Sequence, residues 1–332
     1  MLLSIVIPHY NLPKEMLKRC IESITAQGMQ ECDYEVIIID DGSKEPPLWI
    51  EDEYKTCNIR LINNAHGGPG AARNKGIEAA QGKYIQFIDA DDYLITNGQI
   101  LQCLAMLQEE KPQILRFGYI VKTDDAPLKP KTGKVKFGNA ISGAIHMRDK
   151  NLSGSPCTYF FQKSLAIENG IEFSTDIFHE DEEFNTKLHY HAQTLIESDA
   201  RFYCYRIREG STTANQSKEF ETRRIEDFFK IIEKLYQFRV KNAASANVIQ
   251  RAGIDHKLHT LCVDGILNLM FDNREADDIY DKCITSLKPL GLYPLPKANY
   301  SFKYRIFRLL ANSKTGMKAL RLIIPRKKPL KR

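Results

Sequence analysis

Tyr84-Ile85-Gln86-Phe87-Ile88-Asp89-Ala90-Asp91-Asp92 (residues 84–92) is the stretch that decides the fold of this chain. Its apolar part predicts a buried strand, and three carboxylates follow where that strand should end. Carboxylates this close together repel one another unless a cation lies among them. Mg²⁺ and Mn²⁺ prefer carboxylate oxygens, and Mg²⁺ often shares them with substrate phosphates. The stretch therefore predicts a metal–diphosphate site, against the alternative of a solvated aspartate-rich turn.

The chain before residue 84 alternates short apolar strands with helical patterns. Strands are predicted at residues 4–8, 34–39 and 59–62. One helix is predicted to begin after an Asn11 cap, with Leu17, Cys20, Ile21 and Ile24 on its apolar face, and another spans about residues 71–80. Apolar strands that alternate with helices are typical of a parallel α/β sheet, whose ligands bind beyond the carboxyl ends of the strands.

Length and composition describe an ordinary globular protein. The 332 residues are 43% hydrophobic and 27% charged, which suggests two domains or one large domain with an appendage. No run of about 18 apolar residues occurs, and the N-terminus lacks the basic region of a signal peptide. Eight scattered cysteines without a Cys-x-x-Cys pair favour reduced thiols. We therefore expect a cytoplasmic protein.

The net charge of +5 is unevenly distributed. Residues 301–332 hold eleven basic side chains and no acidic one, whereas residues 1–300 hold 36 basic and 42 acidic ones. Apolar residues alternate with the basic ones in this tail. We favour an amphipathic helix on the anionic inner face of the cytoplasmic membrane over a docked terminal helix with a frayed basic end.

Three further segments provide groups suited to a nucleotide. Pro8 and Tyr10 lie at the end of the first strand, where a ring can stack on a base, and Asp40-Asp41-Gly42-Ser43 offers an acceptor for a uracil imide N–H. Residues 67–74 combine a glycine turn, a helix N-terminus and Arg73 for anionic oxygens. Within the first segment, His9 is expected to pack locally rather than to contact the donor.

In this order and spacing, the segments resemble the family 2 glycosyltransferases, inverting enzymes of the GT-A fold that use nucleotide-sugar donors. The resemblance is dense over about residues 2–95 and thinner to about residue 213. It implies a doubly wound, mostly parallel sheet flanked by helices, followed by a helical C-terminal region. It also implies donor-binding residues, namely Pro8, Tyr10, Asp40, Asp41, Arg73, Asn74 and Asp89. Mn²⁺ or Mg²⁺ would be held by Asp91, with Asp92 assisting.

The same resemblance assigns the acceptor side. His179-Glu180-Asp181-Glu182-Glu183 matches the family's Glu-Asp motif at a helix start, with Asp181 as the base that takes the acceptor proton and Glu180 as an acceptor contact. The alternative is an acidic first helical turn favoured by the helix dipole. Arg208 and Ser211, before and after Gly210, are candidates for the diphosphate, with a surface turn as the alternative.

Together these features predict an enzyme that moves a hexose or N-acetylhexosamine from a UDP-sugar to a saccharide acceptor, expected to be lipid-linked, in bacterial polysaccharide biosynthesis. Residues 1–110 would bind the donor, 111–215 the acceptor, 216–300 would form a helical region and 301–332 the basic tail. The Gln-x-x-Arg-Trp motif of the processive synthases is missing, which argues against a polymerase of that kind. Two alternatives stay open: a nucleotidyltransferase of similar fold, although its Gly-rich, Lys-containing phosphate loop is missing near the N-terminus, and a non-catalytic partner of membrane or nucleic acid.

Overall fold

The computed structural model of this chain divides into two compact units. It describes residues 1–55, 58–123, 132–150, 154–175, 177–207, 217–272, 277–298 and 302–323. The first unit comprises Met1–Gly143, Gly154–Asp176 and Lys187–Arg208, and the second comprises Ala144–Ser153, Ile177–Thr186 and Glu209–Arg332. Helix α7 (Glu180–His191) contributes residues to both.

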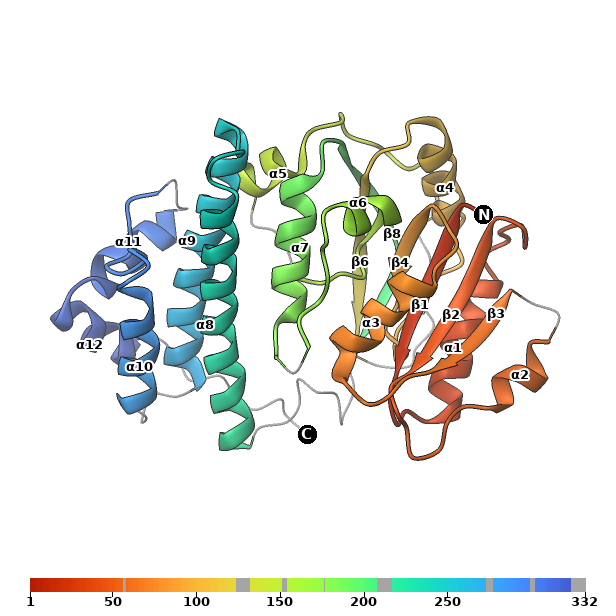
Figure 1. Ribbon diagram of the computed structural model, residues 1–332, viewed down its shortest axis with the longest axis horizontal. Helices are drawn as coiled ribbons and strands as arrows, with labels where there is room; N and C mark the ends of the chain where they lie inside the picture. The colour runs from red at the N-terminus through yellow and green to blue at the C-terminus, as the bar shows by residue number, and fades with distance from the viewer. Residues whose placement is uncertain are drawn as a thin grey trace. The chain divides into compact units, whose positions relative to one another are not determined.

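The first unit is built on an eight-stranded mixed sheet (Figure 1). Its order is β3-β2-β1-β4-β7-β6-β8-β5. The strands are β1 (Leu3–His9), β2 (Tyr34–Asp40), β3 (Ile59–Asn63), β4 (Tyr84–Phe87), β5 (Tyr93–Leu94), β6 (Ile114–Lys122), β7 (Tyr159–Gln162) and β8 (Leu195–Arg206). Four of the seven pairings among these described strands are parallel, including those that join β3, β2, β1 and β4.

The first four predicted strands are confirmed; the apolar runs of β1, β2 and β4 are buried, and β3 is half-buried. Every residue of β2 and β4 is buried, and Ile5, Val6 and Ile7 of β1 have no exposed surface. Burying an aliphatic side chain of this size contributes about 1.5–3 kcal/mol. Since the strands run parallel, their carboxyl ends bring residues 8–10, 40–41 and 88–92 to one edge of the sheet.

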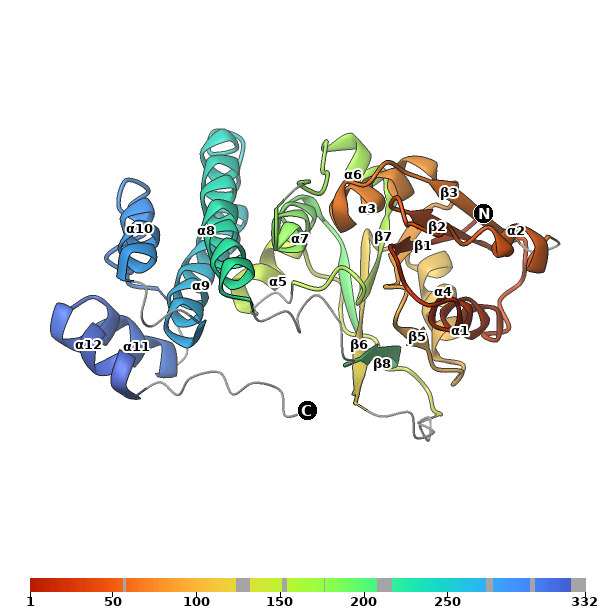
Figure 2. The ribbon, with the colours of Figure 1, turned by 90° about the horizontal axis from the view of Figure 1, so that it is seen from below.

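Helices cover both faces of this sheet. In Figure 2, α1 (Lys14–Thr25) and α4 (Gln99–Glu109) lie on one side, and α3 (Gly68–Ala79) and α6 (Lys163–Glu168) lie on the other. A short helix, α2 (Trp49–Glu53), precedes β3. The predicted apolar face of α1 is confirmed, since Leu17, Cys20, Ile21 and Ile24 are fully buried.

Two local predictions are wrong. Asn11 does not cap α1: the helix begins after Pro13, and Asn11 is in a left-handed conformation (φ 48°) with its amide oxygen accepting from the Lys44 N–H. Helix α3 begins at Gly68, three residues before the predicted Ala71. Its Gly76 packs against Val6, where a Cβ would lie 2.2 Å from Cγ1, so a larger residue there would force the helix off the sheet.

The second unit contains α8 (Lys218–Lys241), α9 (Val248–Asp272), α10 (Asp277–Leu287), α11 (Phe302–Ala311) and α12 (Lys314–Ile323). Helix α8 packs on α9 and α10, as Figure 1 shows. Residues 144–149 of α5 (Gly143–Asp149) also belong to this unit. The expected helical C-terminal region is confirmed by α8, α9 and α10.

The described part of the basic tail, α11 and α12, is docked along one side and exposed along another. Phe307, Ala311, Met317 and Leu320 are buried. The exposed apolar residues are Phe302, Ile306, Leu309, Leu322 and Ile323. Across the described ranges, none of the helices has the length and hydropathy needed to span a membrane.

Candidate functional site

The ends of β1 and β2 are joined by a buried His–Asp pair. His9 Nδ1 lies 2.8 Å from Asp40 Oδ1, and both side chains are at most 3% exposed. The other carboxylate oxygen of Asp40 accepts from the backbone N–H of Ser43 at 3.1 Å. Each carboxylate oxygen has two acceptor sites, so each oxygen of Asp40 retains capacity for one more donor. Its predicted role toward a uracil N–H stays a prediction, and the structure adds that Asp40 holds the β2 turn.

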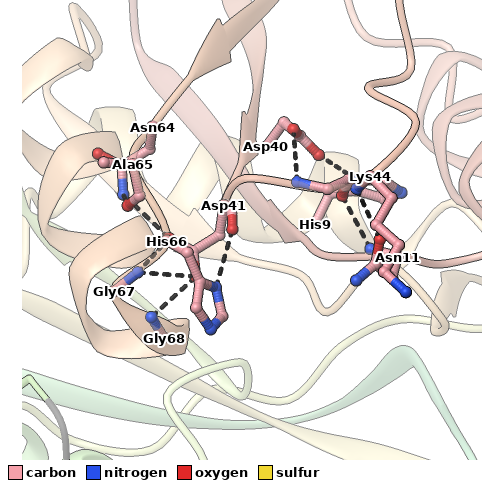
Figure 3. A network of polar contacts seen from close by, with 11 residues as sticks. His9, Asn11, Asp40, Asp41, Lys44, Asn64, Ala65, His66, Gly67 and Gly68 are labelled. Atoms are coloured by element: carbon pink, nitrogen blue, oxygen red, sulfur yellow. Dashed lines mark hydrogen bonds and ion pairs between the residues drawn. The ribbon is translucent and has the colours of Figure 1, made fainter.

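Asp41 holds a second turn (Figure 3). Its carboxylate accepts from the Asn64 side chain at 3.0 Å and from the backbone N–H groups of Gly67 and Gly68 at 3.1 and 2.8 Å. A carboxylate at the first residues of α3 is also favoured by the helix dipole. Asp41 is only 3% exposed, so its charge orders the loop that presents α3.

Tyr10 and His66 form an exposed aromatic pair beside these turns. Their ring centroids are 4.4 Å apart with an interplanar angle of 23°. Tyr10 is 46% exposed, and His66 is fixed by Asp41, whose carboxylate lies 3.0 Å from Nδ1. A flat, half-exposed pair of rings is suited to stacking on a nucleobase. The sequence analysis found Tyr10 but missed His66; an aromatic residue directly before Gly67-Gly68 was the available signal.

The acid cluster follows β4 as predicted, and its members differ in exposure. Asp89 and Asp91 are half-buried, while Asp92 is 2% exposed. Arg73 Nη2 of α3 is 3.1 Å from Asp89 Oδ1. The guanidinium also lies over Phe173 at 5.5 Å. Arg73 is therefore held at the cluster, and its guanidinium is of the kind that pairs with phosphates.

Both oxygens of Asp92 are engaged within the first unit. Tyr203 donates its hydroxyl to Oδ2 at 2.5 Å, and the Arg206 backbone N–H donates to Oδ1 at 2.8 Å. Burial, followed by the negative charge of Asp89, raises the pKa of Asp92 to about 8. These contacts give Asp92 a role in fixing the turn; its predicted assistance to the metal stays a prediction.

The donor set fits a cation that a substrate shares. Among the residues that the structure describes, no group of three or more His, Cys, Asp or Glu side chains gathers around one point. Mg²⁺ is usually held by one or two carboxylates, several waters and substrate phosphates. Asp89 and Asp91 provide half-exposed carboxylates of the required kind, so these residues would hold such an ion together with a diphosphate.

The remaining residues predicted to bind the donor are Asn74, Pro8, Arg208 and Ser211. Asn74 exchanges two hydrogen bonds of 2.8 Å with the backbone of Phe173, which ties α3 to the segment before α7. Pro8 is half-buried and, by strand alternation, points to the same face of the sheet as Val6 and α3. Arg208 and Ser211 lie outside the described residues.

A pocket of about 540 Å³ lies beside the ends of β1 and β2. It is lined by residues of the β1–α1 and β2–α2 connections, among them His9, Asn11, Lys14, Lys44 and Trp49. Lys14 is directed over the Trp49 ring at 4.5 Å and also pairs with Glu53 at 2.5 Å. Among the lining residues, His9 also pairs with Asp40.

The candidate acceptor residues lie in the second unit, at the start of α7. Glu180 is 8% exposed, and Asp181 is half-buried with Oδ1 accepting from the Glu182 N–H at 2.9 Å. His179 has a left-handed backbone (φ 66°) that is uncommon outside glycine. The predicted acidic helix start is confirmed, and the catalytic roles of Glu180 and Asp181 stay predictions.

Comparison with known proteins gives a family and several relatives. The family model "Glycosyl transferase family 2" matches residues 4–166. "Uncharacterized glycosyltransferase EpsJ" of Bacillus subtilis is 28% identical over 220 residues, which cover 64% of this chain and 63% of that protein. "Poly(ribitol-phosphate) beta-glucosyltransferase" of Bacillus spizizenii is 30% identical over 227 residues, 63% of this chain and 33% of that protein. The chain thus spans less than two thirds of these relatives.

Solved structures confirm the fold. TarS residues 1–349 of S. aureus, in complex with UDP-GlcNAc, superposes with a TM-score of 0.67 at 21% identity, covering 97% of this chain and 90% of that one. A mannosyltransferase of Pyrobaculum calidifontis, in complex with GDP-Man and Mn²⁺, gives a TM-score of 0.53 at 13% identity, covering 97% and 87%. The expected GT-A sheet with C-terminal helices is therefore confirmed.

Proposed function

Because this chain belongs to glycosyl transferase family 2 over residues 4–166, we propose that it transfers a hexose or N-acetylhexosamine from a UDP-sugar to a saccharide acceptor, with inversion. The acceptor is a lipid-linked saccharide of a bacterial surface polysaccharide. Relatives named poly(ribitol-phosphate) glucosyl- and N-acetylglucosaminyltransferases support a cell-surface polymer as the pathway's product, and a solved neighbour bound to UDP-GlcNAc supports the donor class.

One observation carries the proposal: two half-exposed carboxylates and a guanidinium meet at the end of β4. Arg73 pairs with Asp89 at 3.1 Å, and Asp91 follows two residues later. A diphosphate needs both a cation-binding acid and a fixed positive charge, and this arrangement provides them. A sheet that merely presented a binding surface would gain nothing from placing three acids in four residues.

The remaining roles follow from the chemistry of inversion. Tyr10, with His66 behind it, offers a face for the uracil, and Arg73 offers N–H donors to the diphosphate. Asp181 takes the proton of the acceptor hydroxyl as it attacks the anomeric carbon, and Glu180 orients that hydroxyl. Mn²⁺ or Mg²⁺ held by Asp91 and Asp89 would stabilise the negative charge of the departing UDP.

Release of UDP tests the proposal directly. The purified protein is incubated with UDP-glucose, UDP-galactose, UDP-GlcNAc and UDP-GalNAc in Mn²⁺ or Mg²⁺, and UDP is measured with and without EDTA. We expect one donor to be hydrolysed in a metal-dependent way by the wild type and not by Asp91→Asn. Failure of all four donors would contradict the transferase. Release of pyrophosphate from nucleoside triphosphate and sugar phosphate would favour a nucleotidyltransferase.

Attachment to the membrane is a further part of the proposal. Helices α11 and α12 combine exposed apolar side chains with Lys303, Arg305 and Lys318, which are also exposed. Neither helix contains an acidic residue. Such a surface is complementary to anionic lipid headgroups, where a lipid-linked acceptor would be found. The enzyme would then act at the inner face of the cytoplasmic membrane.

A further inference from the structure

A buried lysine contacts the turn of α7 that carries Asp181. Lys257 Nζ of α9 lies 2.6 Å from Glu182 Oε2, and the two side chains are 3% and 17% exposed. Nearby residues on the same helix, Ile254 and Leu258, are 1% exposed. A buried ion pair is weak evidence for stability, because desolvation offsets much of the attraction. An apolar residue would fill this position equally well, so the lysine calls for another explanation.

A second buried charge holds the residue just before this turn. Asp227 of α8 is 1% exposed, and its Oδ2 accepts from the backbone N–H of Phe178 at 3.2 Å. Its Oδ1 lies 2.7 Å from Lys230 Nζ, and Arg223 Nε lies 3.7 Å from Oδ2. The negative charge of Asp227 is therefore balanced by cations on its own helix. Its hydrogen bond with Phe178 fixes the backbone of that residue and does not neutralise a charge.

Between these two contacts lies a strained residue. His179 has φ 66°, a conformation that costs a non-glycine residue about 1 kcal/mol or more. Its ring packs edge-on against Phe228 of α8, with centroids 5.0 Å apart. A strained turn persists only where its surroundings hold it. Here α8 contacts the turn through Asp227 and Phe228, and α9 contacts it through Lys257.

We propose that Lys257 and Asp227 are positioning residues for Asp181. The two contacts, Lys257–Glu182 and Asp227–Phe178, are named here the α7 clamp. The clamp fixes the backbone on both sides of Glu180-Asp181, so that the base is presented in one orientation. This inference rests on the proposed role of Asp181, and it assigns to the C-terminal helices a function in catalysis that exceeds support of the fold.

Lys257→Met tests the clamp, with Lys234→Met as its matched control. Lys234 also pairs with an acid of the α7 turn, Glu183, but at 3.7 Å and with its side chain 45% exposed. We expect Lys257→Met to lower kcat for transfer by about 10- to 100-fold with an unchanged donor KM, because a displaced catalytic group slows the chemical step and leaves donor binding intact. Lys234→Met should keep the wild-type kcat.

Hydrogen exchange of the amides of residues 178–183 gives a readout that does not depend on activity. Exchange should accelerate in Lys257→Met and in Asp227→Ala, which removes the acceptor for the Phe178 N–H, and stay unchanged in Lys234→Met. If removal of Lys257 alone prevents folding, Glu182→Gln/Lys257→Met removes both charges, leaves no unpaired ion, and should show the same faster exchange and lower kcat.

The outcomes separate the clamp from the proposed function. Unchanged exchange in Lys257→Met would overturn the clamp whether or not the enzyme transfers sugar. Faster exchange with a wild-type kcat, in an enzyme that Asp181→Asn inactivates, would overturn positioning and leave the proposed function standing. Full transfer by Asp181→Asn would show that Asp181 is not the base, and the clamp would then have no role in catalysis.

Discussion

The hydroxyl of Tyr203 donates a 2.5 Å hydrogen bond to Asp92, and the two residues are 111 positions apart in the chain. Tyr203 lies on β8, and Asp92 lies in the turn after β4. The same hydroxyl accepts from the backbone N–H of Asp89 at 3.4 Å. One fully buried tyrosine thus holds both ends of the acid cluster, which fixes where Asp89 and Asp91 can reach.

Replacing Tyr203 by phenylalanine should therefore weaken both stability and donor hydrolysis. Loss of the hydroxyl leaves a buried carboxylate oxygen without its donor, which costs about 1–3 kcal/mol. The acid turn also loses its hydrogen bond to β8, so metal-dependent UDP release should fall. The control is Tyr119→Phe, at an exposed position on β6, which should keep wild-type stability and UDP release. Chemical denaturation and UDP release measure the two effects. Wild-type hydrolysis by Tyr203→Phe would contradict a role in holding the cluster.

Asp91 and Asp92 should differ in how their removal affects UDP binding. Asp91→Asn removes a half-exposed charge and should abolish the gain in UDP affinity that Mn²⁺ provides. Asp92→Asn keeps an acceptor for the Arg206 N–H and should retain most of that gain, at some cost in stability. Calorimetry with UDP, in Mn²⁺ and then in EDTA, measures both.

The nucleobase provides the control for that experiment. If Tyr10, His66 and Asp40 recognise uracil, UDP should bind more tightly than GDP or ADP. Equal affinities for the three would contradict the uridine assignment while leaving the metal site intact, because the diphosphate is common to all.

Local sequence predicted the sheet edge well and the contacts across it poorly. Ile38 and Phe87 lie in short apolar runs that are typical of buried strands, so the position of the acids that follow each run could be predicted. Tyr203 and His66 act through partners brought together by the fold, and nothing in a single sequence shows that pairing. The predicted Asn11 cap failed for the same reason, because the Lys44 backbone takes its side chain.

Asp181→Asn should separate donor chemistry from transfer. The amide has nearly the same shape but cannot take a proton, so transfer should fall by roughly 10²–10⁴-fold, the usual contribution of a general base. UDP affinity should not change. Product formation with a saccharide acceptor measures the first and calorimetry the second. Retention of transfer near the wild-type rate would mean that Asp181 is only an acid of the first helical turn.

His179 should make the free energy of unfolding depend on pH. Burial, and then the charge of Arg224, lower the pKa of His179 from 6.5 to about 4. Between these values the unfolded chain binds a proton that the folded chain excludes, so stability should fall as the pH falls from 6.5 to 4, by up to about 3 kcal/mol. His179→Asn tolerates the left-handed backbone and does not titrate, and its urea unfolding should depend less on pH over this window. Equal slopes for the two proteins would contradict the shift.

Changes to the buried face and to the exposed face of the basic tail should have different effects. Ending the chain at Tyr300 would remove Phe307, Met317 and Leu320, which are buried, so this truncation should destabilise the second unit. A sharper test changes only exposed residues. Ile306 and Leu309 of α11 are 45% and 63% exposed.

The double variant Ile306→Glu/Leu309→Glu should leave stability within about 0.5 kcal/mol, as is usual for surface changes, and should lose binding to vesicles containing anionic lipid. Two introduced negative charges oppose headgroups that each basic residue attracts by about 1 kcal/mol. Val248→Glu, at a position 79% exposed on α9, adds charge outside the tail and should sediment with the vesicles as the wild type does. Added salt should release the wild type, because screening acts over about 8–10 Å. If the double variant and the wild type bind equally well, α11 does not contact lipid, and its basic residues serve some other surface.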